Sequence, residues 1–540
     1  MSETTVFCAR QVLTMDANMP QATHVAVRDG RILAVGDASC ADPWGGGQLD
    51  TRFADAVIAP GFVEGHAHLM EGGLWRYTYV GFMDRLDPQG QRWPGVTRNE
   101  EVIARLREVA THEPTIGWGF DPIFISQARL NRDMLDQVST ERPVAVLFSS
   151  LHLMVCNTAA LRSAGYLEAG DVEGLMRDAQ GRPTGELREM AAMFPVLRRL
   201  GVDFRRLAAG PEVLRAYGAS ARRAGVTTAT DLFSSLTAQE VDATLEVVQT
   251  PDFPIRLVPA VGVVDGDPVA IAREMAQMRQ RSTSKLRMGA VKLMTDGSIQ
   301  GFSARLQWPG YLGGVPNGMW NTPPEVLRGL IAGFHASGTP MHIHVNGNEA
   351  SAVTLEALAH AMAGPGPRDH RHTLQHGQLM DEAQFRRAAA LGVGVNLFAN
   401  HIYYFGDQHV AHTVGLERAQ RMNACRSALE AGVNLAIHSD APVTPLAPLF
   451  TAWCAVQRQT ASGRVLGQAQ AITPAQALRA ITLGAAWSLN MDHEVGSIEV
   501  GKRADMVVLQ DNPLTVQPSA IKDIAVRATV LGGQVFEAGA

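Results

Sequence analysis

The chain has no long hydrophobic run. No stretch of about 18 consecutive apolar residues, the length needed to cross a bilayer as a helix, occurs in the 540 residues. The opening residues, MSETTVF, also lack a basic region followed by a long apolar stretch, so we expect no secretory signal peptide. These absences favour a cytoplasmic protein without a membrane partner.

Cysteine is scarce as well. Its five residues are widely spaced and form no Cys-x-x-Cys pair: Cys8, Cys40, Cys156, Cys425 and Cys454. The odd number and the wide spacing argue against a disulfide framework and indicate a reducing compartment.

The sequence has no block of basic residues. Lysine and arginine number 47 against 53 aspartate and glutamate residues, which gives a formal net charge of −6. Proteins that bind nucleic acid or anionic membranes usually carry a basic surface, so we expect neither partner. With 46% hydrophobic and 19% charged residues, the composition is typical of a globular enzyme with a large core.

What the sequence does contain is a pair of histidines, His66 and His68, at the end of the largely apolar run 57–63. Side chains at i and i+2 of a strand point to the same face, so both imidazoles can converge on one point. Imidazole is a good ligand for zinc and neighbouring divalent metals. On its own such a pair is a weak signal, and residues downstream add to it.

Further candidate ligands follow, each at the end of a short apolar or β-branched run: Lys292, His344, His376 and Asp440. Segments with the spacing of amphipathic helices lie between them, at 324–337, 350–362 and 381–391. Strand, ligand and helix in repetition are typical of a (β/α)8 TIM-like barrel of the α/β class. In such a barrel the active site gathers at the carboxyl ends of the strands.

The number of predicted strands agrees with this architecture. Eight segments have strand character, at 57–65, 225–231, 255–263, 288–294, 340–345, 372–376, 393–398 and 434–439. The candidate ligands fall on the first, fourth, fifth, sixth and eighth of them. His342 has the same strand parity as His344, so either can be the ligand on the fifth strand.

Six motifs in a consistent order carry a family resemblance. They are Pro60-Gly61-Phe62 before the histidine pair, Lys292 followed by Asp296-Gly297-Ser298, His344-Val345-Asn346-Gly347-Asn348, Gln375-His376-Gly377-Gln378, Ser439-Asp440-Ala441-Pro442-Val443 and the segment 496–505, GSIEVGKRAD. Over nearly its whole length the chain resembles the amidohydrolase superfamily. Within that superfamily it is similar to the YtcJ-like or amidohydrolase-3 group, which includes N-substituted formamide deformylases.

The resemblance implies a metal centre with one or two divalent ions, for which zinc is expected. The implied ligands are His66, His68 and Asp440 for the more buried ion, and His344 and His376 for the second. Lys292 would be carbamylated and bridge both ions, because an unmodified ammonium has no lone pair and repels cations. If Lys292 stays unmodified, we expect a single ion. The structural alternative is a buried lysine paired with a carboxylate.

A reaction follows from this set of ligands. A divalent metal lowers the pKa of bound water toward about 7, which makes hydroxide available at neutral pH. The resemblance implies that Asp440 accepts the proton of the water and returns it to the leaving nitrogen. His401 and His152 are candidates to hold the carbonyl oxygen or the substrate. His438, two residues before Asp440, could face the metal too, although a supporting position outside the ligand set is favoured.

The chain is far longer than the roughly 250 residues of a minimal barrel, so additional parts are required. The resemblance implies that residues 1–56 and 491–540 together form a small β-sandwich, and that residues 57–490 form the barrel. The Asp29-Gly30 pair predicts a hairpin in the first of these segments. The stretch 69–207 is too long for a barrel loop, so we predict an inserted subdomain.

Aromatic residues make up only 6% of the chain but gather near the predicted mouth of the barrel. The residues predicted to wall an apolar pocket are Trp75 and Trp118 in the insertion, Phe302 and Trp308 after the fourth strand, and Tyr403 after the seventh. The insertion would act as a lid that shapes this pocket. The alternative is a small independent core that uses the rings of the insertion for packing.

These features predict a metal-dependent hydrolase that acts on a small molecule. The first hypothesis is hydrolysis of a non-peptide C–N bond in an N-acyl or N-formyl amide with an apolar or aromatic part. The second is an esterase, lactonase or cyclic-imide hydrolase, because the same metal chemistry serves those carbonyls. A catalytically silent scaffold would have lost metal ligands, and all six are present. Members of the family often form dimers, so the resemblance implies a homodimer.

Overall fold

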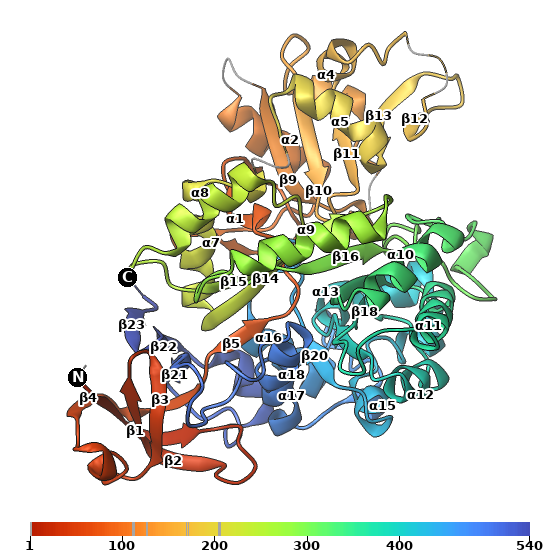
Figure 1. Ribbon diagram of the computed structural model, residues 1–540. Helices are drawn as coiled ribbons and strands as arrows, with labels where there is room; N and C mark the ends of the chain where they lie inside the picture. Colours follow the sequence, from red (N-terminus) through yellow and green to blue (C-terminus); the bar gives the residue numbers. More distant parts are fainter. Residues whose placement is uncertain are drawn as a thin grey trace. The chain divides into compact units, whose positions relative to one another are not determined.

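A computed structural model describes residues 3–110, 114–125, 128–168, 170, 172–203 and 207–539. The chain divides into two compact units. The first combines Met1–His68 with Ala221–Ala540, and the second is Leu69–Ser220. Figure 1 shows the chain coloured along its sequence.

An eight-stranded parallel sheet forms the centre of the first unit, in the order β20-β19-β18-β17-β16-β15-β14-β5. Its strands are β5 (Phe62–Glu64), β14 (Val226–Ser234), β15 (Arg256–Val263), β16 (Ala290–Met294), β17 (Met341–Val345), β18 (Thr373–His376), β19 (Gly394–Leu397) and β20 (Leu435–Ile437). Each corresponds to one of the eight predicted segments. Most of their residues are buried, which is typical of parallel strands covered on both faces.

The two edge strands of this sheet meet just beyond their carboxyl ends. The Asp440 N–H donates to the His66 carbonyl at 3.1 Å, and the His68 N–H donates to the Ala441 carbonyl at 2.8 Å. The sheet therefore curls until β5 and β20 lie side by side, consistent with the predicted TIM-like barrel.

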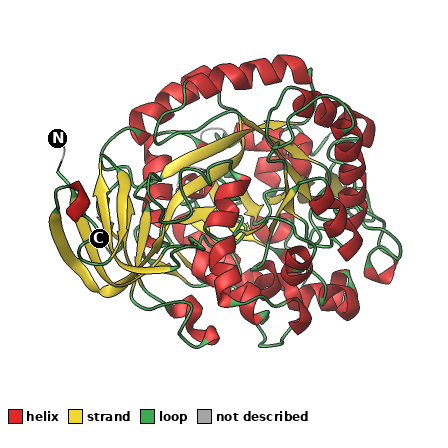
Figure 2. Ribbon diagram, turned by 60° about the horizontal axis from the view of Figure 1, so that its bottom comes forward, coloured by secondary structure: helices red, strands yellow, loops and turns green. Residues whose placement is uncertain are grey.

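Helices follow the strands and lie around them (Figure 2). They are α8 (Ala238–Val248), α9 (Pro268–Gln280), α10 (Pro324–Ala336), α11 (Asn348–Met362), α12 (Glu382–Ala390), α13 (His401–Gln408), α14 (Gly415–Ala419), α15 (Cys425–Glu430), α16 (Pro448–Gln457), α17 (Pro474–Ala480) and α18 (Leu483–Ser488). In α10 the buried residues include Leu327, Leu330, Ile331 and Phe334, which is the i, i+3, i+4, i+7 spacing of one helix face. This face packs inward and confirms the helix predicted at 324–337.

Strands from both ends of the chain form one seven-stranded sheet, in the order β23-β22-β21-β4-β1-β2-β3. They are β1 (Thr5–Leu13), β2 (Gln21–Arg28), β3 (Arg31–Gly36), β4 (Gln48–Pro60), β21 (Met506–Leu509), β22 (Val526–Leu531) and β23 (Gln534–Glu537). Figure 1 shows the red and blue strands beside one another. Asp29 and Gly30 turn the β2–β3 hairpin with φ of 54° and 73°, as predicted. The two-layered sandwich stays a prediction.

The first predicted strand, 57–65, is divided between the two sheets. Residues up to Pro60 belong to β4 in the terminal sheet, and β5 in the barrel begins at Phe62. Gly61 stands between them, where a Cβ atom would lie 2.0 Å from the Thr227 hydroxyl oxygen. The chain passes from one sheet to the other through a position that only glycine fits.

The second unit has its own six-stranded sheet, in the order β12-β13-β11-β10-β9-β6. Its strands are β6 (Thr78–Tyr79), β9 (Thr115–Phe120), β10 (Val144–Phe148), β11 (Leu153–Cys156), β12 (Leu175–Arg177) and β13 (Pro183–Arg188), and a separate pair is β7 (Arg85–Leu86) with β8 (Arg92–Trp93). Its helices are α1 (Met70–Leu74), α2 (Asn99–Val109), α3 (Arg132–Asp136), α4 (Thr158–Ser163) and α5 (Glu189–Arg199), and α7 (Pro211–Arg223) begins in this unit. The unit therefore has a sheet and a core of its own.

Across the described residues, no helix is both long and apolar enough to cross a membrane. All five cysteines have free thiols.

Candidate metal centre

The carboxyl ends of the barrel strands position the predicted ligands. His66 and His68 follow β5, while His344 and His376 lie on β17 and β18. Asp440 comes three residues after β20 and has a left-handed backbone with φ of 54°. Because parallel strands end on one side of a barrel, side chains from distant parts of the sequence meet there.

Asp440 lies at the centre of the resulting cluster. One carboxylate oxygen, Oδ1, lies 3.2 Å from His66 Nε2 and 3.5 Å from His68 Nε2. The other oxygen lies 3.7 Å from His376 Nδ1. His66, His68 and Asp440 offer ligand atoms that all lie within 4.8 Å of one another, which is a spacing that one metal ion can span.

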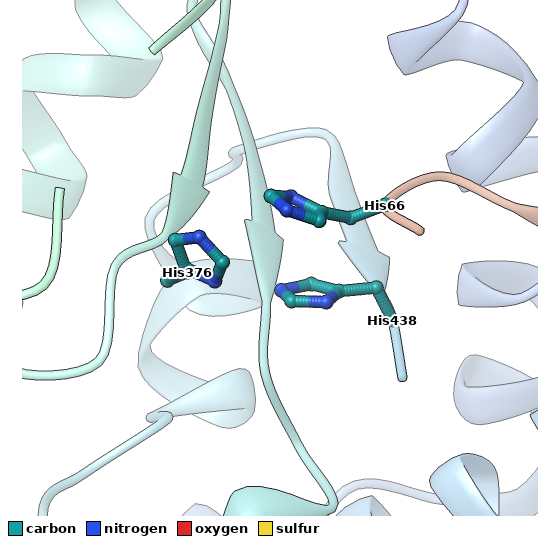
Figure 3. Close-up of side chains that lie close together, drawn as sticks. All are labelled: His66, His376 and His438. Atoms are coloured by element: carbon teal, nitrogen blue, oxygen red, sulfur yellow. The ribbon is translucent and has the colours of Figure 1, made fainter. Parts of the chain in front are cut away.

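A second group of possible ligands overlaps the first and contains His66, His376 and His438. Figure 3 shows the rings of His66 and His438 one above the other, with His376 facing them from a neighbouring strand. The ring centroids of His66 and His438 are 4.7 Å apart. The sequence predicted a supporting position for His438, whereas the structure brings its ring among the candidate ligands. Its spacing of two residues from Asp440 was the signal.

Lys292 on β16 has a buried amine, with 1% of the residue exposed. Its Nζ has no hydrogen-bond partner among the described residues. Burial lowers the pKa of Lys292 to about 7, although the nearby Asp440 opposes this shift. The ion pair with a carboxylate, the structural alternative from the sequence, is absent from the contacts of the described residues.

The donor set fits a divalent metal. Buried polar atoms are normally paired, yet Lys292 Nζ, His376 Nδ1 and both ring nitrogens of His438 have no hydrogen-bond partner in the described part of the chain. Burial lowers the pKa of His66, His376 and His438 and so keeps their rings neutral, with lone pairs available. Unpaired neutral imidazoles beside a carboxylate are the chemistry that zinc and related ions use.

Asp440 is held in its charged form. Burial alone would raise the pKa of this carboxyl, but the neighbouring side chains of His66, His68 and His376 hold it well below its usual range. An ionised carboxylate is therefore available at neutral pH both as a ligand and as a proton acceptor.

Gln375 on β18 fixes the orientation of His66. Its Oε1 lies 2.8 Å from His66 Nδ1, so this nitrogen donates and Nε2 is left facing Asp440. The amide of Gln375 also donates to His342 Nδ1 at 2.9 Å. His342 is thus engaged in this network, while the ring of His344 lies 4.6 Å from that of His376. The arrangement favours His344 over His342 as the ligand on β17.

His344 lies beside the two compact groups of ligands rather than inside them. Its Nε2 is 3.2 Å from the Gly297 carbonyl and 3.7 Å from the Asp296 carboxylate. Burial raises the pKa of Asp296 to about 7, against the effect of hydrogen bonds from the backbone of Asn346, Gly347 and Arg305.

Glu64 is a buried acid outside the set of site residues predicted from the sequence. It accepts hydrogen bonds from the His66 N–H at 3.1 Å and from the Ser439 hydroxyl at 2.7 Å. Burial raises the pKa of Glu64 to about 8. The carboxyl joins the segment that carries His66 to the segment that carries Asp440. Its spacing of two before the histidine pair was the available signal.

The two predicted substrate-holding histidines lie in different units. His401, at the start of α13, is fully buried in the first unit. His152 belongs to the second unit, where its Nδ1 lies 3.0 Å from the Glu189 carboxylate. The catalytic role of each stays a prediction.

The predicted pocket aromatics have varied surroundings. Trp118 is 1% exposed and its ring lies 5.0 Å from that of Trp75 in the core of the second unit, as the packing alternative describes. Phe302 packs on Tyr311 at 5.2 Å. Trp308 is 94% exposed and Tyr403 lies 5.0 Å from Phe450. These contacts describe the surroundings of each ring within its own unit, and the shared pocket wall stays a prediction.

A parallel barrel with histidine and aspartate side chains clustered at one end of its strands defines a class of metal-dependent enzymes. Residues 54–536 match the Amidohydrolase family, and the chain belongs to that family. The family predicted from the motifs is confirmed.

Named relatives align with most of this chain. Protein LONG AFTER FAR-RED 3 of Arabidopsis thaliana is 27% identical over 97% of this chain and 90% of its own length. The N-substituted formamide deformylase of Arthrobacter pascens is 26% identical over 97% of this chain and 96% of its own length. The crystal structure of an uncharacterized metal-dependent hydrolase from Pyrococcus horikoshii OT3 has a TM-score of 0.72 and 20% identity, and covers 95% of this chain and 99% of that one. This last likeness shows the fold.

Proposed function

We propose that the protein is a metal-dependent hydrolase of a non-peptide C–N bond, acting on an N-acyl or N-formyl amide with an apolar or aromatic part. The observation that carries the proposal is the cluster of the Asp440 carboxylate with His66, His68 and His376 at the carboxyl end of the barrel, where buried ring nitrogens of His376 and His438 have no hydrogen-bond partner among the described residues. The similarity to an N-substituted formamide deformylase supports an amide as substrate.

The proposed centre holds one or two divalent ions, zinc being the expected metal. Its ligands would be His66, His68 and Asp440, with His344 and His376 for a second ion, and a carbamylated Lys292 would serve both ions. When bound, the metal supplies Lewis-acid polarisation and lowers the pKa of a water molecule. The neutral amine expected at Lys292, whose pKa lies near 7, is the form that reacts with carbon dioxide.

Asp440 is the proposed acceptor of the water proton and its donor to the leaving nitrogen. The carboxylate is ionised, and two of the histidines that surround it also hold it in place. A carboxylate has two oxygen atoms, so one could bind the metal ion while the other accepts and returns the proton. His401 is proposed to contact the substrate carbonyl.

Amine release tests this function. Zinc-loaded enzyme is offered N-formyl, N-acetyl and N-aroyl aromatic amines, beside matched esters and cyclic imides. We expect turnover of amides, loss of activity after chelation, and recovery on adding zinc. Activity confined to esters or imides would replace the amide assignment with the second hypothesis, which uses the same site.

The number of metal ions tests the role of Lys292. In Lys292→Ala we expect the metal content per chain to fall by one ion relative to the wild type. Wild-type enzyme prepared in 13C-bicarbonate should show a carbamate carbon signal that this variant lacks. An unchanged metal content in Lys292→Ala would remove the bridging role.

A further inference from the structure

Three side chains outside the candidate metal centre are linked by hydrogen bonds, and this series ends at a ring nitrogen that has no partner among the described residues. His401, His409 and Thr413 are each at most 1% exposed. His401 Nδ1 lies 3.0 Å from His409 Nε2, and His409 Nδ1 lies 2.8 Å from the Thr413 hydroxyl. The remaining nitrogen, His401 Nε2, is buried and has no hydrogen-bond partner among the described residues.

The local backbone brings these three side chains together. Helix α13 begins at His401, directly beyond the carboxyl end of β19, and continues into a π-helical turn at His409–Thr413. The Val414 N–H donates to the His409 carbonyl at 3.0 Å, which is the i to i+5 bond of a π-helix. Such turns are uncommon inside α-helices and occur frequently at functional sites.

Two rings clamp His401 so that only its edge is free. Phe405 stacks on one side with centroids 4.3 Å apart, and Phe398 lies 4.8 Å away. Phe398 in turn contacts the ring of His438 at 4.8 Å, which places this clamp next to the candidate metal centre. With Nδ1 engaged by His409, the orientation of the His401 ring is fixed and Nε2 is its one unused polar atom.

The direction of the hydrogen bonds follows from the distances. The Thr413 hydroxyl has two acceptors within reach, the His409 carbonyl at 3.4 Å and His409 Nδ1 at 2.8 Å. Bonds donated by a hydroxyl are about 2.5–3.0 Å long, so only the second is a good one. Thr413 therefore donates to His409 Nδ1, His409 Nε2–H donates to His401 Nδ1, and the proton of His401 is on Nε2.

We propose that His401 is a catalytic residue whose Nε2–H donates to the substrate carbonyl oxygen, and that His409 and Thr413 are positioning residues that fix its tautomer. This inference rests on the proposed function for the reaction that it assists. No proton is transferred in this step. The His401 imidazole keeps its Nε2 proton and stays neutral while negative charge develops on the carbonyl oxygen.

The surroundings suit an uncharged donor. Burial and the neighbouring His409 lower the pKa of His401 well below its usual value, although Asp440 opposes the shift. A neutral imidazole can lie beside bound cations without repulsion, whereas an imidazolium would be expelled. Each bond in the chain also polarises the next, so Thr413 strengthens the donor at a distance.

The tautomer is measured directly by proton–nitrogen correlation spectra of zinc-loaded protein labelled with 15N-histidine. His401→Phe identifies the signals of His401 by their loss. We expect Nε2–H at His401 in the wild type and in Thr413→Ser, and a change toward Nδ1–H in Thr413→Val, which lacks the hydroxyl. Nδ1–H at His401 in the wild type would overturn the inference.

Kinetics supply the second readout, on whichever amide, ester or imide of the panel is hydrolysed. Loss of a donor of this kind costs roughly 100-fold or more in kcat, so we expect that decrease in His401→Phe with KM little changed. Thr413→Val should lose about 10-fold through weaker polarisation, and Thr413→Ser should restore kcat. His412→Gln, an exposed neighbour in the same turn, should match the wild type.

The two proposals fail separately. If the enzyme hydrolyses no member of the panel, the proposed function is wrong, and the tautomer spectra alone decide the inference. If the enzyme hydrolyses a compound of the panel and Thr413→Val keeps the kcat of the wild type, the proposed function stands. The inference that Thr413 and His409 position His401 is then overturned.

Discussion

Asp440 concentrates the chemistry of the site in one carboxylate. Asp440→Asn keeps the shape of the side chain but removes both the charge and the ability to accept a proton. We expect kcat to fall by about 1,000-fold or more, since general base and ligand are lost together. Thermal melting should stay within a few degrees of the wild type, because the histidine rings around it are neutral. A variant with substantial activity would show that the proton acceptor is another group.

Lys292 gives the metal-free protein a pH-dependent stability. Its pKa is about 7 in the folded chain because of burial, against about 10.4 in an unfolded chain. Between these values the unfolded chain holds a proton that the folded chain has released, so the free energy of unfolding increases as the pH rises from 7 toward 10. The full shift corresponds to about 5 kcal/mol.

Denaturant unfolding of metal-free protein at pH 7, 8 and 9 measures this slope. Lys292→Met removes the titrating group, and we expect it to flatten the increase and to be more stable than the wild type at pH 7. Equal slopes in the two proteins would mean that the lysine is not buried in the metal-free state.

At the scale of elements, Gly61 shows how the family motif at the start of the barrel is enforced by packing. A Cβ at this position would lie 2.0 Å from the Thr227 hydroxyl oxygen and 2.7 Å from its Cβ. We expect Gly61→Ala to lower the free energy of unfolding by about 2–3 kcal/mol, as overpacking of a core does. Denaturant unfolding measures the change.

Two variants control for this effect. Thr227→Ala in the Gly61→Ala background removes the closest contact and should recover part of the loss. Gly329→Ala in α10 meets open space, since an added Cβ would have no heavy atom of another element within 4 Å, and alanine favours a helix. That variant should be as stable as the wild type or slightly more so. An equal loss in both alanine variants would assign the cost to backbone freedom instead of packing.

Elements with a regular pattern were predictable from the sequence, and the contacts between them were not. All eight barrel strands appear where buried apolar runs end in polar side chains, because a parallel strand buries both faces. The division of 57–65 at Gly61 was missed, since a continuous apolar run does not reveal a change of sheet. The positions of His66 and Asp440 followed from motifs. The roles of Gln375 and Glu64 depend on pairings across strands that a linear pattern does not contain.

The same distinction applies to the aromatic residues. Their gathering in the sequence around Trp75 was visible, but whether rings form a core or a pocket depends on which face of each strand they occupy. Trp118 lies on β9 with all residues of that strand buried, so its ring packs inside the second unit. Composition alone could not separate these outcomes.

At the scale of the whole molecule, a buried ion pair ties the terminal sheet to the barrel within the first unit. Arg256 on β15 contacts both carboxylate oxygens of Asp505, at 2.5 and 2.9 Å, and both side chains are at most 5% exposed. Asp505 Oδ1 also accepts a hydrogen bond from the Gly532 N–H at 2.8 Å, in the turn between β22 and β23. One carboxylate therefore joins a barrel strand to the last hairpin of the chain.

Removing the Asp505 carboxylate should destabilise both the terminal sheet and the barrel strand that it joins. Asp505→Ala leaves the Arg256 guanidinium buried without its partner, and breaking a buried pair in this way costs about 3–5 kcal/mol. Asp55→Ala is the matched control, because Asp55 pairs with Arg527 in the same terminal sheet but is 72% exposed, where a pair contributes about 0–1 kcal/mol. Thermal melting of the metal-loaded protein should show a large decrease only for Asp505→Ala. Similar decreases in both variants would mean that the terminal sheet is held by its apolar core, and that the carboxylate adds little to the connection.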